Sequence, residues 1–158
     1  MDTLVSGNSR RLDRFPAGPR GLFCYGTLQF DDVLKGLLGR VPHRLPASAP
    51  GYRAAALEGR VYPGLVVQAL GCSAPGVVLT DLSNEEWRIL NAFEDDQYEL
   101  RELSLSTGTM GLAYVWQGVD VRTEDWDAEE FQARHLSAYA ERCGRIGPRL
   151  AAGEPKGE

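Results

Sequence analysis

Short apolar runs separated by glycine and proline dominate the first half of the chain. Residues Leu22–Tyr25 are four apolar positions in a row that end at Gly26, which predicts a short buried strand. Apolar residues cluster again between turn-forming residues, and this predicts further strands at 52–57, 65–70 and 77–80. The proline-rich stretch 42–50 is predicted to be a loop.

Three helices are predicted from capping residues and helical spacing. Asp31 is expected to cap a short helix that Gly39 ends. Ser83 is followed three residues later by a glutamate, which is the pattern of a capping box at a helix start. Asp127 begins a similar pattern, and the helix that it opens is predicted to run to about Cys143.

A hairpin is predicted between the last two helices, with its turn at residues 107–109. Every second residue of its second arm is large and apolar, so these residues share one face: Met110, Leu112, Tyr114 and Trp116. Strands therefore outnumber helices and are mostly joined as hairpins. We predict an α+β fold rather than a repeating βαβ unit, and periodicity leaves an open sheet and a barrel equally allowed.

The chain of 158 residues predicts one domain, which we place at residues 21–143. The flanking residues lack apolar periodicity and are rich in glycine and proline. They are expected to be a mobile leader over residues 1–20 and a mobile tail over residues 144–158.

The charge balance argues against several kinds of partner. With 17 basic and 22 acidic residues, the net charge of −5 does not suit a nucleic-acid-binding module. No apolar run is long enough to cross a membrane. The three cysteines lack metal-binding spacing, and the first 20 residues lack the apolar core of a secretion signal. We therefore expect a reduced, cytoplasmic protein, monomeric by default.

Glu94 is the first candidate for chemistry. A helical stripe starts at Trp87 and continues through Leu90 and Asn91, and Glu94 is its next position. Desolvation and the negative end of the helix would both raise the pKa of a carboxyl group there, as a general base near neutral pH requires. The alternative is that Glu94 only marks where the helix frays into solvent.

A second candidate is the turn after the first strand, residues 25–28. Glycine lets the backbone approach a ligand, and consecutive N–H groups can bind an anion there, although an ordinary strand-to-helix turn would look the same. Nucleophile signals are thinner. Cys24 has no diagnostic spacing to His43 or His135, and two histidines without paired cysteines make a zinc site a poor expectation.

Five blocks of the sequence, taken in order and spacing, resemble a known family. They are Phe23–Arg40 (FCYGTLQFDDVLKGLLGR), Gly51–Tyr52, Gly59–Pro63 (GRVYP), Leu82–Tyr98 (LSNEEWRILNAFEDDQY) and Trp126–Leu136 (WDAEEFQARHL). Together these blocks resemble the AIG2-like branch of the γ-glutamyl cyclotransferase superfamily, and the resemblance extends over about residues 22–143.

The resemblance implies a small mixed β-barrel flanked by helices, with a pocket at one mouth of the barrel. The family's essential glutamate falls on Glu94, which ends the stretch LNAFE and is followed by Tyr98. The family's substrate loop falls on Tyr25, Gly26, Thr27 and Leu28. Tyr98 matches a tyrosine close to the site, and Tyr114 matches an aromatic position on the following strand.

The implied reaction needs no cofactor and no metal. The free α-amine of a γ-glutamyl amine or amino acid attacks its own γ-carbonyl, and 5-oxoproline and the free amine are released. Glu94 would move the protons, and the loop would hold the α-carboxylate. Two alternatives stay open: a relative that only binds a small metabolite or a partner, and removal of a γ-glutamyl protecting group from a biosynthetic intermediate.

Overall fold

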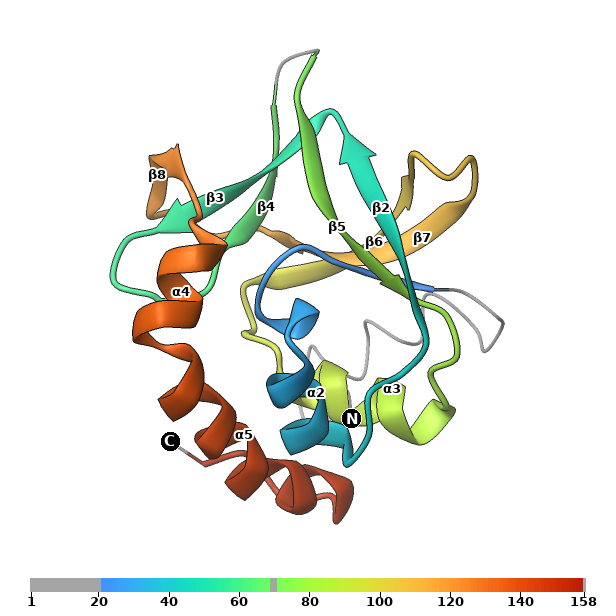
Figure 1. The fold of residues 1–158 in the computed structure, drawn as a ribbon, viewed down its shortest axis with the longest axis vertical. Helices are drawn as coiled ribbons and strands as arrows, with labels where there is room; N and C mark the ends of the chain where they lie inside the picture. The colour runs from blue at the N-terminus through green and yellow to red at the C-terminus, as the bar shows by residue number, and fades with distance from the viewer. Residues whose placement is uncertain (1–20, 69–70, 158) are drawn as a thin grey trace, which may run out of the picture.

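The structure, a computed structural model, describes residues 21–68 and 71–157, so the expected leader lies outside the described residues. Its strands form one mixed sheet, and most of its helices gather on one side of that sheet (Figure 1). The strands are β1 (Leu22–Cys24), β2 (Arg44–Pro50), β3 (Tyr52–Leu57), β4 (Gly64–Val67), β5 (Ser73–Leu79), β6 (Tyr98–Ser104), β7 (Met110–Trp116) and β8 (Val121–Asp125). The helices are the short 3-10 helix η2 (Thr27–Gln29), α2 (Asp31–Leu38), α3 (Asn84–Phe93), α4 (Ala128–Arg134) and α5 (Leu136–Ala151).

Strand β7 organises the sheet. One edge of β7 is paired with β6 along its whole length, in the antiparallel register expected of the predicted hairpin. The other edge is shared, because β1 pairs with it at Leu112 and β4 pairs with it at Val115, both in parallel. The sheet therefore divides into two arms, β1–β5–β2 and β4–β3–β8.

The α+β class is confirmed, but the described sheet does not close into the barrel that the resemblance implies. Its path ends at β2 on one arm and at β8 on the other. Strand β7 is nevertheless buried on both faces. Leu112, Tyr114 and Trp116 face the cluster under the helices, as their alternation predicts, whereas Met110 at the strand start is 51% exposed.

The predicted loop at residues 42–50 is wrong for its greater part. Strand β2 occupies Arg44–Pro50 and pairs with β5 in seven antiparallel positions. It lies at the end of the sheet, where a proline can be accommodated because one side of the strand needs no ladder bonds. Pro46 and Pro50 therefore sit in a strand.

Helix α2 differs from its prediction only at its start. Its N-cap is Phe30, which makes no side-chain capping bond, so Asp31 is the first helical residue rather than the cap. Gly39 ends the helix in the left-handed conformation at φ 80°, as predicted, and a glycine adopts this conformation without the steric cost of a side chain.

The last predicted helix divides in two and continues further than expected. Asp127 caps α4, and the chain bends at His135 before α5 begins. Helix α5 then runs past Cys143 to Ala151, with Ile146 and Leu150 buried. The expected domain boundary at 143 and the mobile tail are therefore wrong for residues 144–151. No described helix has the length and apolar character that crossing a membrane requires.

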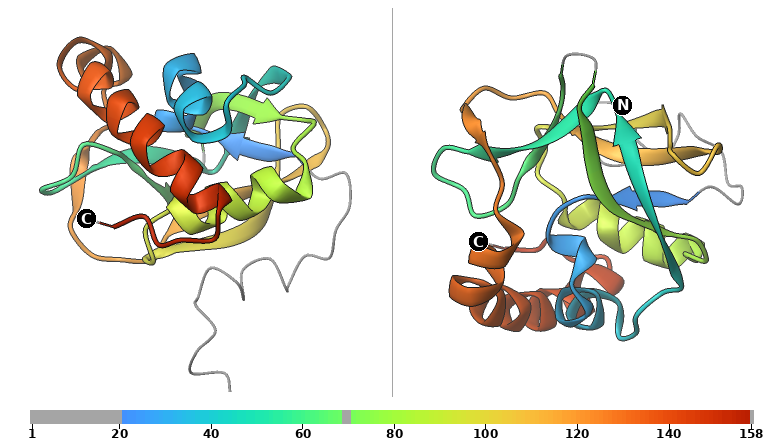
Figure 2. Two further views of the ribbon diagram at one scale, coloured as in Figure 1. Left: turned by 90° about the horizontal axis from the view of Figure 1, so that it is seen from below. Right: turned by 45° about the horizontal axis from the view of Figure 1, so that its top comes forward.

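The helices α2, α3 and α5 lie together on one side of the sheet (Figures 1 and 2). Helices α2 and α5 approach closely because each presents a glycine at the crossing. A methyl group added to Gly147 would meet the carbonyl oxygen of Gly36, and it would lie 2.8 Å from the carbonyl oxygen of Leu37. Gly147, which is unfavourable in a helix on its own, is thus required by the packing of α5 against α2.

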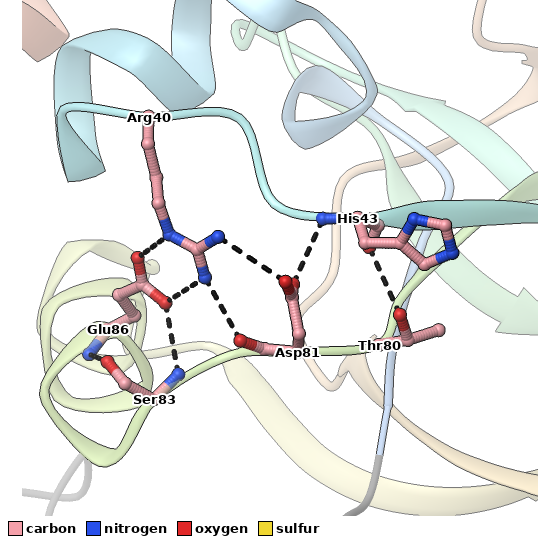
Figure 3. Close-up of polar contacts among 6 residues, drawn as sticks. All are labelled: Arg40, His43, Thr80, Asp81, Ser83 and Glu86. Atoms are coloured by element: carbon pink, nitrogen blue, oxygen red, sulfur yellow. Dashed lines mark hydrogen bonds and ion pairs between the residues drawn. The ribbon is translucent and has the colours of Figure 1, made fainter.

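The start of α3 is held by a polar cluster drawn in Figure 3. Ser83 and Glu86 form the predicted capping box, with Ser83 Oγ accepting from the Glu86 N–H at 3.1 Å. Arg40 binds both carboxylate oxygens of Glu86, at 2.6 and 2.8 Å, and also donates to the carbonyl oxygen of Asp81. The Arg40 guanidinium holds the pKa of Glu86 below its ordinary value. This cluster ties the loop after α2 to α3, the helix that Glu94 follows.

The close crossing of α2 and α5 gives a matched pair of substitutions. Gly147→Ala should lower the free energy of unfolding by about 1–3 kcal/mol, because the added methyl group overlaps backbone atoms of α2. Gly144→Ala, one turn earlier in α5, meets no atom within 4 Å and should raise stability by about 0.5–1 kcal/mol through helix propensity. Urea unfolding of both variants measures the difference, and equal effects would contradict the crossing described.

Candidate functional site

A cavity of about 140 Å³ opens where the two arms of the sheet separate, between the end of β1 and the start of β4. A cavity of this size can hold a small ring. All seven residues singled out from the sequence line it: Tyr25, Gly26, Thr27, Leu28, Glu94, Tyr98 and Tyr114. They come from a loop, a helix end and both strands of the hairpin, so only the fold brings them together.

The loop after β1 crosses the gap between the arms. A methyl group added to Gly26 would lie 2.7 Å from Cγ of Pro63, so glycine is required for the two arms to meet here. Residue Thr27 then opens the 3-10 helix, whose first hydrogen bond runs from the Gln29 N–H to the Gly26 carbonyl oxygen at 3.1 Å. The N–H groups of Thr27 and Leu28 precede that bond and have no acceptor within the turn.

Tyrosine hydroxyls fix the floor of the cavity. The Tyr25 hydroxyl donates to the carbonyl oxygen of Tyr114 at 2.6 Å, and the Tyr114 hydroxyl donates to Oδ1 of the buried Asn91 at 3.2 Å. The Tyr98 hydroxyl donates to the carbonyl oxygen of Pro63 at 2.5 Å. Tyr25 and Tyr98 thus each link one arm of the sheet to the hairpin, and Tyr114 links the hairpin to α3. Together these bonds hold the cavity in a fixed shape.

Burial keeps these hydroxyls protonated. It raises the pKa of Tyr25 well above its ordinary value, and the negative charge of Glu94 adds to that effect. Burial likewise raises the pKa of Tyr98 strongly, with further contributions from Tyr25 and Glu94. The tyrosines are therefore hydrogen-bond donors at neutral pH rather than bases.

Glu94 lies at the C-terminal end of α3, as its position in the stripe suggested. The helix itself ends at Phe93, and Glu94 is the C-cap with an extended backbone at φ −71° and ψ 148°. Its N–H still bonds to the carbonyl oxygen of Leu90 at 3.1 Å. The side chain is half-buried and lines the cavity, so the alternative of a frayed, solvated end is wrong. The elevated pKa that the sequence predicts for Glu94 stays a prediction.

Five further polar residues line the cavity that the sequence analysis did not select, namely Tyr62, Asp95, Tyr139, Arg142 and Lys156. Asp95 accepts from the Tyr62 hydroxyl at 2.7 Å and from the Gln97 N–H at 2.8 Å, and it lies 3.9 Å from Arg60. Burial and the bond to Asp95 raise the pKa of Tyr62 to about 12. Asp95 is thus held against one wall of the cavity by its own partners.

Thr27 and Tyr139 close the opposite wall. The Thr27 hydroxyl donates to the Tyr139 hydroxyl at 3.4 Å, which joins the substrate loop of the resemblance to α5. Burial raises the pKa of Tyr139, and Glu94 adds to the shift. Tyr139 lies on the apolar side of the last predicted helix, but helical spacing alone does not indicate that its side chain contacts the loop after β1.

The cysteine–histidine alternative does not assemble at this cavity. Cys24 lies in the wall, is buried, and donates to the carbonyl oxygen of Leu22. Burial and the charge of Glu94 raise its pKa well above the ordinary value, which disfavours the reactive thiolate. His43 and His135 are exposed and do not line the cavity. Over residues 21–68 and 71–157, no three His, Cys, Asp or Glu side chains cluster as a metal site.

The reactivity of the three thiols tests the burial of Cys24 in the cavity wall. In the native protein at pH 8, Cys72 is the partly exposed thiol and should react first with an alkylating reagent. Cys24 and Cys143 should react only after unfolding, because burial raises both pKa values, that of Cys143 to about 12. Peptide mapping after timed alkylation identifies the modified residue. Fast native labelling of Cys24 would contradict the buried placement.

Comparison with known proteins now places the chain. Residues 22–130 match the sequence model of the family described as "Gamma-glutamyl cyclotransferase, AIG2-like". The chain is 31% identical over 126 residues to AIG2-like protein D of Arabidopsis thaliana, covering 75% of this chain and 82% of that protein. It is 35% identical over 118 residues to AIG2-like protein C of the same plant, covering 70% and 68%. A solution structure of an Arabidopsis thaliana protein superposes with a TM-score of 0.61, at 25% identity and 80% coverage of each chain. The chain belongs to the AIG2-like γ-glutamyl cyclotransferase family.

Proposed function

We propose that the protein is a γ-glutamyl cyclotransferase-type enzyme that converts a γ-glutamyl amine or amino acid into 5-oxoproline and the free amine. The observation that carries this proposal is the meeting of one half-buried carboxylate, Glu94, with the loop Tyr25–Leu28 across a single small cavity. Membership of the family supports it, because the two features coincide with the positions expected from the family resemblance.

The reaction begins with the α-ammonium group of the substrate. The Glu94 carboxylate takes one proton from this group, which frees the nitrogen lone pair. The amine then attacks the γ-carbonyl carbon of the same molecule and forms a C–N bond, while the carbonyl electrons move to oxygen. When the carbonyl re-forms, the bond to the leaving nitrogen breaks, and Glu94 returns its proton to that nitrogen. The attacking nitrogen then gives its second proton to Glu94 and becomes the neutral N–H of the lactam, and that proton passes to the released amine, which leaves as an ammonium ion. One C–N bond forms and one breaks, so no net oxidation or hydrolysis occurs.

Positioning supplies most of the rate in such a reaction. The attacking amine and the γ-carbonyl belong to the same flexible glutamyl group. A cavity of fixed shape that holds this group folded keeps the two reacting atoms close together, so the entropic cost of folding is met on binding. The tyrosine floor is suited to this task because its hydroxyls are committed to backbone and amide acceptors. The cavity favours a folded, ring-like glutamyl group over an extended one.

The loop supplies hydrogen-bond donors for the negatively charged groups of the substrate. The N–H groups of Thr27 and Leu28 are main-chain donors that stay in place whatever the protonation state of the site. In the proposed complex they hold the α-carboxylate of the substrate, and a donor of the same loop stabilises the oxygen on which negative charge develops. Glycine at position 26 keeps side-chain atoms out of this approach.

Replacing the proposed base tests the mechanism. Glu94→Gln keeps the shape of the side chain and removes its proton transfer, so 5-oxoproline formation should fall at least about a hundredfold. The matched control is Asp96→Asn, which removes the same charge two residues away from an exposed position outside the cavity. The control should keep its activity within about twofold.

The assay uses a panel of γ-glutamyl amines, γ-glutamyl amino acids and glutathione, with 5-oxoproline measured chromatographically. Full turnover by Glu94→Gln on a good substrate would contradict the role given to Glu94. No 5-oxoproline from any member of the panel, together with a thermal shift on adding one of them, would instead indicate a protein that binds γ-glutamyl compounds without converting them.

A further inference from the structure

The rim of the cavity carries two cations that the family match does not include. Arg142 lies on α5 and Lys156 lies in the segment after it, whereas the match ends at residue 130. Both side chains line the cavity. The segment passes beside α3 and α5 in the left view of Figure 2, which places it next to the helix end that carries Glu94.

Lys156 is inserted into the protein rather than extended into solvent. Among residues 151–157 it alone is partly buried, and its neighbours on both sides are exposed. Its ammonium group donates to the carbonyl oxygen of Phe93 at 2.6 Å and lies 5.7 Å from the centre of the Phe93 ring. An ammonium group has three donors, so this bond leaves two for a ligand.

The positive charges of Arg142 and Lys156 are available to bind an anionic group of a ligand. In the part of the chain that the structure describes, neither Arg142 nor Lys156 forms an ion pair with a carboxylate. Burial lowers the pKa of Lys156, the negative charge of Glu94 raises it, and the positive charge of Arg142 lowers it to a smaller extent. The nearby Asp95 is already engaged by Tyr62 and Arg60. A carboxylate bound at the rim would relieve the repulsion between the cations.

A γ-glutamyl amino acid has two carboxylates, and the depth of the cavity determines which of them reaches Arg142 and Lys156. The loop residues Tyr25–Leu28 are buried, and the N–H groups of Thr27 and Leu28 are assigned to the α-carboxylate of the glutamyl group. The leaving amine must point toward the half-buried rim, where Glu94 returns its proton. In a γ-glutamyl amino acid, a second carboxylate stands one carbon away from that leaving nitrogen, close to the residue that protonates it.

We infer that Arg142 and Lys156 bind the carboxylate of the leaving group, so that the enzyme selects γ-glutamyl amino acids over γ-glutamyl alkylamines. This inference rests on the proposed function and specifies its substrate class. A charge-assisted bond from each cation would fix the leaving group against the rim. The selectivity then comes from side chains of α5 and the following segment, while the chemistry stays with Glu94 and the loop.

Two substrates that differ only in this carboxylate provide the test: γ-glutamylalanine and γ-glutamylethylamide. Lys156→Met should lower kcat/KM for γ-glutamylalanine by about tenfold or more and change that for the ethylamide less than about twofold. Adding Arg142→Gln should enlarge the loss for γ-glutamylalanine only. The matched control is Arg145→Gln, which removes an exposed cation from the same helix away from the cavity.

The possible results separate this inference from the proposed function. An equal loss on both substrates, or no loss on either, would overturn the inference while leaving the cyclotransferase reaction in place. If the unaltered protein converts neither of these two substrates nor any other member of the panel, the proposed function fails, and binding to the Glu94→Gln variant decides the inference. There, γ-glutamylalanine should bind at least about tenfold more tightly than the ethylamide, and Lys156→Met should abolish the difference. Equal affinities would overturn it.

Discussion

The constraint on which this structure depends is that one edge of β7 serves two partners. A strand has only two edges, and β6 occupies the whole of one, so β1 and β4 must divide the other. Their arms diverge from that point, and the cavity lies in the divergence. The loop that follows β1 can bridge the gap only because Gly26 lets it lie directly against Pro63. The position of the candidate site is therefore a consequence of strand pairing rather than of any single side chain.

A second set of contacts determines where the carboxylate enters this divergence. Helix α3 is fixed at its start by the capping box and by Arg40, which joins it to the loop after α2. It is fixed along its length by the buried stripe that ends at Phe93. Because a helix is stiff, holding its first turn and its apolar face also sets the location of its last residue. Glu94 thus reaches the cavity from the end of a rigid element, while the other candidate residues belong to the loop after β1 and to the hairpin.

Local signals in the sequence predicted the fold well wherever they were sufficient on their own. The capping residues Ser83 and Asp127 mark real helix starts, and the alternation at 110–116 identifies the buried face of β7. The predictions fail where packing overrides composition. Strand β2 contains prolines, which are tolerated because it lies at the end of the sheet. Position 147 is a glycine inside a helix, because a side chain there would overlap α2. The seven candidate site residues do converge. Arg142 and Lys156 could not be found from the sequence, since no motif links α5 and the segment after it to a cavity whose candidate residues all lie between Tyr25 and Tyr114.

The bond between Lys156 and the Phe93 carbonyl has a consequence for how such a protein could diversify. Glu94, the proposed base, and the cations Arg142 and Lys156 line one cavity, but they belong to separate stretches of polypeptide with separate roles in folding. Residues 152–157 bury little apolar surface, so substitutions there are tolerated by the core. A change in the choice of substrate could then begin with substitutions at position 156, which leave both the core and the helix end that carries Glu94 in place.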